Sequence, residues 1–118
     1  MGQRSTLSGH IQEAFVLGDE ERAAVRAAND EVIAGLPDRF HAAEGGMHAL
    51  TRSMFVRSHP WVPYPEQRWP HYRGAVILFG ATYSSLWDSW AEWLHEFEAV
   101  LARLYWEHAV VLMVNEWL

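Results

Sequence analysis

A tryptophan-rich stretch at residues 84–106 constrains the fold of this chain more than any other part of its sequence. Its apolar residues recur at alternating spacings of three and four, the pattern of the buried side of an amphipathic helix. Polar and charged residues occupy the positions between them. We therefore predict one long amphipathic helix at about 84–106, with only Trp93 keeping aromatic surface exposed. Its apolar side consists of Trp87, Trp90, Leu94, Phe97, Leu101 and Leu104, flanked by Leu86, Trp93 and Val100.

The N-terminal half of the chain predicts further helices. Residues 8–17 are compatible with a short helix. Residues 19–34 predict a firmer one, because Asp19 suits the N-cap, Glu20 and Glu21 suit the positive end of the helix dipole, and Gly35 and Pro37 follow. Residues 37–55 predict another helix, interrupted by two glycines.

Two short apolar segments, residues 75–79 and 109–116, predict strands because they are rich in branched aliphatic residues. A strand, a long helix and a second strand in this order favour a right-handed parallel pairing of the two strands. The predicted fold class is therefore α+β and predominantly helical, with the N-terminal helices and the long helix packed against a small sheet. The alternative is an all-α bundle whose last helix runs to residue 118.

The length of 118 residues suits one globular domain, residues 1–118. Residues 1–7 are expected to be flexible. Residues 57–73 hold four of the five prolines and predict a loop rich in proline and aromatic residues, since proline disfavours both helix and central strand.

Composition excludes several classes of chemistry. The chain has no cysteine, which removes disulfides, thiolate nucleophiles and cysteine metal sites, and no lysine, which removes Schiff-base chemistry. No apolar leader segment opens the sequence, and the longest apolar runs are far shorter than the roughly 20 residues of a membrane span. We therefore expect a cytoplasmic protein that has no contact with a membrane.

The net charge of −6 is unevenly distributed. Residues 50–75 carry four arginines and one carboxylate, whereas the segments on either side are both acidic. Binding to a nucleic-acid backbone requires a basic face, so the acidic balance argues against it. Only the middle segment has the charge for such a face.

No catalytic residue and no cofactor are predicted, and the balance of features is against an enzyme. The sequence lacks a nucleophile-elbow motif and a phosphate-binding glycine loop. Glu92 and His95 form a Glu-x-x-His pair of the kind found in di-iron bundles, but this motif occurs once and on the polar side of the predicted helix. We interpret that side as solvated, and Glu92 and His95 as the nearest approach to a metal site.

The loop at 57–73 is the predicted binding surface. Arginine, tryptophan and tyrosine dominate interface hot spots, and closely spaced prolines hold aromatic side chains in an extended shape. The alternative interpretation is that these aromatics fold back over one end of the core. The predicted binding residues are Arg57, His59, Trp61, Tyr64, Arg68, Trp69, His71, Tyr72 and Arg73.

These features favour a small protein-interaction module of an immunity, antitoxin or inhibitor type. It would bind one protein partner through the loop or through an acidic helical face. The alternative is a small-molecule-binding protein or small enzyme, with a pocket lined by Trp87, Trp90 and Trp93 and served by a histidine. Homodimerisation through residues 109–118 is compatible with both hypotheses.

Overall fold

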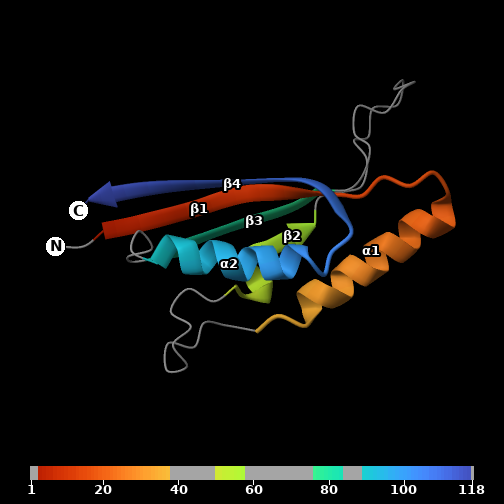
Figure 1. Cartoon of the computed structure of the whole chain (residues 1–118), viewed down its shortest axis with the longest axis horizontal. Coiled ribbons are helices and arrows are strands. Elements are labelled where there is room, and N and C mark those ends of the chain that lie inside the picture. The colour runs from red at the N-terminus through yellow and green to blue at the C-terminus, as the bar shows by residue number, and fades with distance from the viewer. Residues whose placement is uncertain (1–2, 38–49, 58–75, 84–88, 118) are drawn as a thin grey trace, which may run out of the picture.

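The computed structural model describes residues 3–37, 50–57, 76–83 and 89–117, which form a four-stranded antiparallel sheet and two α-helices. The strands lie in the order β2-β3-β1-β4, and both helices pack against one face of the sheet (Figure 1). No helix among these residues is both long and apolar enough to cross a membrane. The elements are β1 (Gln3–Glu13), α1 (Asp19–Ala34), a 3₁₀ turn (Arg52–Met54), β2 (Phe55–Arg57), β3 (Val76–Tyr83), α2 (Trp90–Leu101) and β4 (Trp106–Trp117).

Strand β1 lies in the middle of the sheet, with β3 on one side and β4 on the other, antiparallel to both. Side chains alternate between the two faces, so Leu7 and Ile11 point toward the helices and are fully buried. On β3, Ile77 lies opposite Ile11 and is also buried in the core. The polar residues between them face the other side of the sheet, as expected for a sheet covered on one face.

Helix α2 supplies the largest buried side chain, Trp93, which lies against the sheet and is fully buried. Its ring stacks on Phe97 with a centroid distance of 5.2 Å, and Phe97 in turn contacts Phe79 of β3 at 5.1 Å. The indole N–H of Trp93 donates a hydrogen bond of 3.2 Å to the Tyr83 hydroxyl, so this buried polar group is satisfied. A continuous aromatic cluster therefore joins α2 to the centre of the sheet.

The prediction that Trp93 keeps exposed surface is wrong. Trp93, Phe97, Val100 and Leu101 are buried, whereas Trp90 and Leu94 are only partly buried. A straight helix has 3.6 residues per turn, and it turns a broad face to a sheet instead of the narrow stripe that a seven-residue repeat defines. The helix also ends earlier than predicted, at Leu101 and not at about residue 106. Residues 84–88 of the predicted helix lie outside the described residues.

The predicted helix at 19–34 is confirmed, with the same bounds. Its N-cap is Gly18 and not the predicted Asp19, which lies in the first turn with Glu20 and Glu21. The amide of Gly35 bonds to the carbonyl of Glu31 at its end. Helix α1 lies at an angle to α2, near the end of the sheet where β1 ends and β4 begins (Figure 1). Val32 and Ile33 of α1 and the following Leu36 pack against the core.

The prediction of a predominantly helical fold is wrong, because a four-stranded antiparallel sheet forms the centre of the described chain. Residues 8–13 of the segment expected to be a short helix belong to β1, and residues 3–7, expected to be flexible, form its first part. The all-α alternative is wrong as well, since residues 106–117 are a strand. The polar residues of β1 suit either a strand or a loose helix, and its pairing partners decide between them.

The predicted strands at 75–79 and 109–116 correspond to β3 and β4, but the two do not pair with each other. They run in the same direction only because β1 lies between them, antiparallel to both. Of the helix expected at 37–55, residues 38–49 lie outside the described residues. Its last residues form a single 3₁₀ turn followed by the first residue of β2.

Gly9 of β1 is a position where the sheet has no room for a side chain. A Cβ atom there would lie 2.0 Å from the Val110 carbonyl oxygen and 2.6 Å from the Phe79 ring. We expect Gly9→Ala to lower the free energy of unfolding by about 1–3 kcal/mol, the usual cost of overpacking. Gly80→Ala is the matched control, since its nearest neighbour is 3.5 Å away. Urea denaturation of both variants tests this, and equal effects would contradict it.

The Tyr83 hydroxyl makes stability sensitive to alkaline pH. Burial raises the pKa of Tyr83 above the ordinary value of 10.0; the Trp93 hydrogen bond lowers it, the nearby Glu96 carboxylate raises it, and the net shift is upward. The unfolded chain therefore loses this proton at lower pH than the folded chain. The contribution of protonated Tyr83 to the free energy of unfolding is therefore fully present below about pH 10 and is lost as pH rises through the pKa of the folded state. We expect the urea midpoint to fall above pH 10, and to fall less in Tyr83→Phe; an equal fall in both proteins would contradict this.

Candidate protein-binding surface

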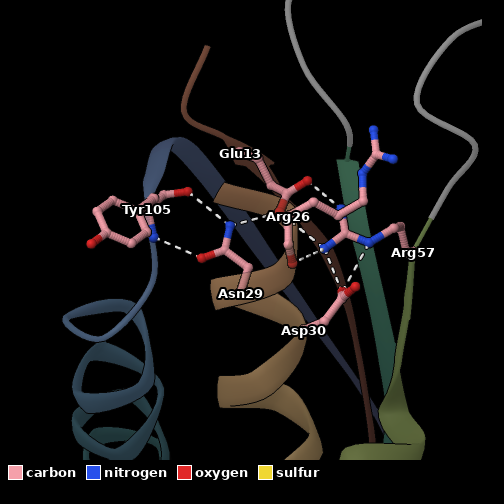
Figure 2. A network of polar contacts seen from close by, with 6 residues as sticks. All are labelled: Glu13, Arg26, Asn29, Asp30, Arg57 and Tyr105. Carbon is pink, nitrogen blue, oxygen red and sulfur yellow. Dashed lines mark hydrogen bonds and ion pairs between the residues drawn. The ribbon is translucent and has the colours of Figure 1, made fainter. Parts of the chain in front are cut away.

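Arg57 is the one predicted binding residue within the described residues, and it lies in an ion-pair network at the end of the sheet (Figure 2). Its guanidinium donates to both oxygens of Glu13, at 3.0 Å for Oε2, and its Nε donates to Asp30 at 3.0 Å. The Glu13 side chain is only 4% exposed. Burial lowers the pKa of Arg57, but hydrogen bonds and charge from Glu13 and Asp30 outweigh burial and raise this pKa.

Asn29 of α1 extends the same network to the start of β4 and is fully buried. Its amide nitrogen donates to Glu13 Oε2 at 2.6 Å and to the Tyr105 carbonyl at 3.1 Å. Its amide oxygen accepts the Tyr105 main-chain N–H at 2.8 Å. Figure 2 shows how these residues converge from α1, β1, β2 and the chain just before β4. The network thus fastens α1 to the sheet through Glu13, Asn29 and Arg57, while the neighbouring Arg26 Nε is buried and has no hydrogen-bond partner among the described residues.

The other predicted residues of the loop, between His59 and Arg73, lie outside the described residues, so the loop stays a prediction. Glu92 and His95 are both exposed on α2. The described residues contain no group of three or more metal-ligating side chains. Of the three tryptophans assigned to a pocket, Trp93 is buried in the core and Trp90 stacks on it at 5.5 Å, while Trp87 lies outside the described part.

The sheet face turned away from the helices carries large apolar side chains. Pairing register places Val56, Leu78, His10 and Val110 side by side in one row across all four strands. A second line of aliphatic residues follows β4 itself. We call this surface the open face. Its large aliphatic residues are between 41% and 61% exposed, and they are Val56, Leu78, Val110, Leu112 and Val114.

Strand β4 also leaves one of its two edges free, since no described residue pairs with it on the side away from β1. It is the longest strand in the sheet, and apart from one register shift opposite residues 12 and 13 its pairing with β1 is regular. Proteins usually protect such edges with lysine, proline, bulges or short strands. Residues 108–116 contain no lysine and no proline, and their only carboxylate is Glu116. This edge is therefore open to a further strand.

Sequence reasoning missed the open face because it did not identify β1. Residues 109–116 are apolar at nearly every position, which suggested a strand covered on both sides. In the structure the odd-numbered residues Ala109, Val111 and Met113 pack against the core, and the even-numbered ones between them are exposed. The signal that could have revealed it is the alternation along β1, where polar residues such as Thr6 and Ser8 lie on the opposite side from Leu7 and Ile11. Such alternation indicates a sheet that the helices cover on one face only.

Removing the Arg57 side chain leaves a buried carboxylate without its cation. We expect Arg57→Met to lower the free energy of unfolding by about 3 kcal/mol, since an uncompensated buried charge is costly. Arg4→Met is the control, because Arg4 makes a 3.0 Å pair with Glu116 on the surface, where such pairs contribute at most about 1 kcal/mol. Adding Glu13→Gln to Arg57→Met should recover part of the loss. Chemical denaturation measures all three, and an Arg57→Met loss no larger than that of Arg4→Met would contradict the structural role.

No family model matches this sequence, and no curated protein matches it. The functional proposal therefore depends on the geometry of the described residues. In that geometry Glu13 binds both Asn29 and Arg57, whereas the open face is exposed and no described residue pairs with the free edge of β4. These two adjoining features form the candidate protein-binding surface.

Proposed function

We propose that this chain is a small protein-binding module whose partner contacts the open face and the free edge of β4. The observation that carries the proposal is the group of five large aliphatic side chains on one face of the sheet, each at least 41% exposed. Val56 and Leu78 form one exposed apolar group, and Val110, Leu112 and Val114 form another across His10. Exposed apolar patches on a protein surface commonly mark interaction sites. We propose that this binding takes place in the cytoplasm, a reducing compartment in which proteins rarely use disulfides, since the chain has no cysteine.

The free edge adds a specific way to bind. An extended segment that pairs with β4 would gain main-chain hydrogen bonds, and its side chains would meet Val110, Leu112 and Val114 on the open face. Edge pairing gives affinity with little dependence on sequence, whereas the side-chain contacts select the partner. Polar residues Thr6 and Ser8 lie beside these aliphatic residues on β1, and so provide a more polar margin.

Two other surfaces remain in competition with this one. The loop at 57–73 is rich in arginine and aromatic residues, and α2 exposes the carboxylates of Glu92 and Glu96. An immunity, antitoxin or inhibitor role is compatible with any of the three surfaces. The small-molecule alternative loses one of its lining residues, because Trp93 is packed inside the core.

Variants of each surface identify the one that binds. Tagged chain is immobilised, exposed to lysate from the source cells, cross-linked and analysed by mass spectrometry. We expect Leu78→Arg with Leu112→Arg to abolish retention of the proteins that wild type retains, because two charges on the open face prevent apolar contact. Both side chains are exposed, so circular dichroism should show an unchanged fold.

The control variants address the competing surfaces. Glu92→Arg with Glu96→Arg reverses the charge on α2, and Trp61→Ala with Tyr64→Ala and Trp69→Ala removes the aromatics of the loop. Both controls should retain the same proteins as wild type. Retention by the open-face variant together with loss in the loop or helix variant would overturn the proposal in favour of that other surface.

A further inference from the structure

We infer that the partner at the free edge of β4 is a second copy of the same chain, joined to the first by antiparallel pairing of the two β4 strands around a two-fold axis at Leu112. This inference rests on the proposed function, since it names the occupant of one part of that surface, the β4 edge, and leaves Val56 and Leu78 exposed. It joins the two four-stranded sheets into one continuous sheet with both open faces on the same side.

A two-fold axis places the same residues on both sides of an interface, so β4 must be complementary to its own reverse. With the axis at Leu112, each residue faces the one equally far on the other side of position 112. On the open face, Leu112 then meets Leu112, and Val110 meets Val114 of the other copy. Both pairings join aliphatic side chains that are 41–57% exposed in the single chain.

The same register brings opposite chemistry together at the ends of the apolar run. His108 faces Glu116 of the second copy, and an imidazole can donate a hydrogen bond to a carboxylate in either of its protonation states. Glu116 already accepts a 3.0 Å hydrogen bond from Arg4 of its own chain, and both side chains are about half exposed. The His108 ring contacts His10 at 5.6 Å and is exposed on the open face, so it is available to the second copy.

Neighbouring registers are less complementary. An axis at Val111 places His108 opposite Val114, and Glu116 opposite the ring of Trp106. An axis at Met113 places Glu116 opposite Val110, a charge against an aliphatic side chain. Of the three axes, only the one at Leu112 sets all of Val110, Leu112 and Val114 against aliphatic residues and also sets His108 against Glu116. Register in sheets is selected by this matching of faces.

The second copy also extends the apolar row across the sheet. In one chain the row runs from Val56 through Leu78 and His10 to Val110, where it ends at the free edge. Val114 of the second copy continues this row across the interface. By symmetry, Val114 of the first copy continues the row of the second copy, on the other side of Leu112. The joined sheets thus carry two parallel rows, one on each side of Leu112. Pairing also covers the edge that each β4 exposes in the single chain.

Light scattering and cysteine cross-linking of the purified chain test this inference. The wild type should elute with twice the chain mass of 13.6 kDa. Leu112→Arg places two cations against each other at the axis and should shift the mass to that of a single chain. Val56→Arg, on the opposite edge strand and 61% exposed, is the matched control and should remain a dimer.

Cross-linking tests the register in the fold as it stands, because the chain has no cysteine of its own. Leu112→Cys should form a disulfide with itself under mild oxidation. Val110→Cys and Val114→Cys should each fail to do so alone, yet cross-link when the two proteins are mixed. Paired strand positions have the Cα separation that a disulfide needs.

A wild-type protein with the mass of one chain at high concentration overturns the inference, as does a dimer that persists in Leu112→Arg or that cross-links through Val110→Cys alone. None of these results bears on whether another protein is retained from lysate. A monomer whose open-face variant loses a lysate protein leaves the proposed function standing with a different partner. A dimer with the expected cross-links, in which the open-face variant loses native copies of this chain and no other lysate protein, supports self-association as the role of the β4 edge.

Discussion

The structure depends on β1 having a strand on each side. Main-chain pairing with β3 and β4 holds three strands in one register, and Leu7 and Ile11 of β1 lie beneath α2 at the centre of the core. Gly9, between them, allows the Phe79 ring and the β4 main chain to approach closely. Without β1, β3 and β4 would have no common neighbour, and the aromatic face of α2 would have no continuous surface to cover.

Polar contacts set the orientation of α1 on the sheet, which apolar packing alone does not define. Two aliphatic faces can slide past each other at little cost, whereas Asn29 has one position from which it reaches both Glu13 and the Tyr105 main chain. Arg57 then joins β2 to the same carboxylate. The angle of α1 to the sheet is therefore set by hydrogen bonds at one end of the molecule, while its packing energy comes from Val32, Ile33 and Leu36. Buried polar groups of this kind specify an arrangement more than they stabilise it.

The predictable parts of the chain were those with local signals. Helix α1 was predicted correctly from its acidic first turn and its terminal glycine and proline, and the branched residues of β3 and β4 indicated strands. Strand β1 was missed because its polar buried residues have distant partners: Ser5 bonds to Asn115, and Glu13 to Arg57. The open face was missed for the same reason, since it requires knowing that β1 lies beside β4. Arg57 was assigned to binding on its residue type alone. Its partners in the fold, Asp30 and Glu13, lie 27 and 44 residues away in the sequence, so the pattern around Arg57 did not indicate them.

The distance along the chain between β1 and β4 has a consequence for folding. Ser5 and Asn115 are 110 residues apart, yet they lie side by side in the sheet. During synthesis, β1 leaves the ribosome well before β4, so the residues between them must be made before its last neighbour exists. Contacts of such long range form slowly, because loop closure must come before any gain from pairing. Because β1 has few apolar residues and several polar ones, it can remain solvated until its partner strands are available. The same composition made β1 hard to identify as a strand from the sequence.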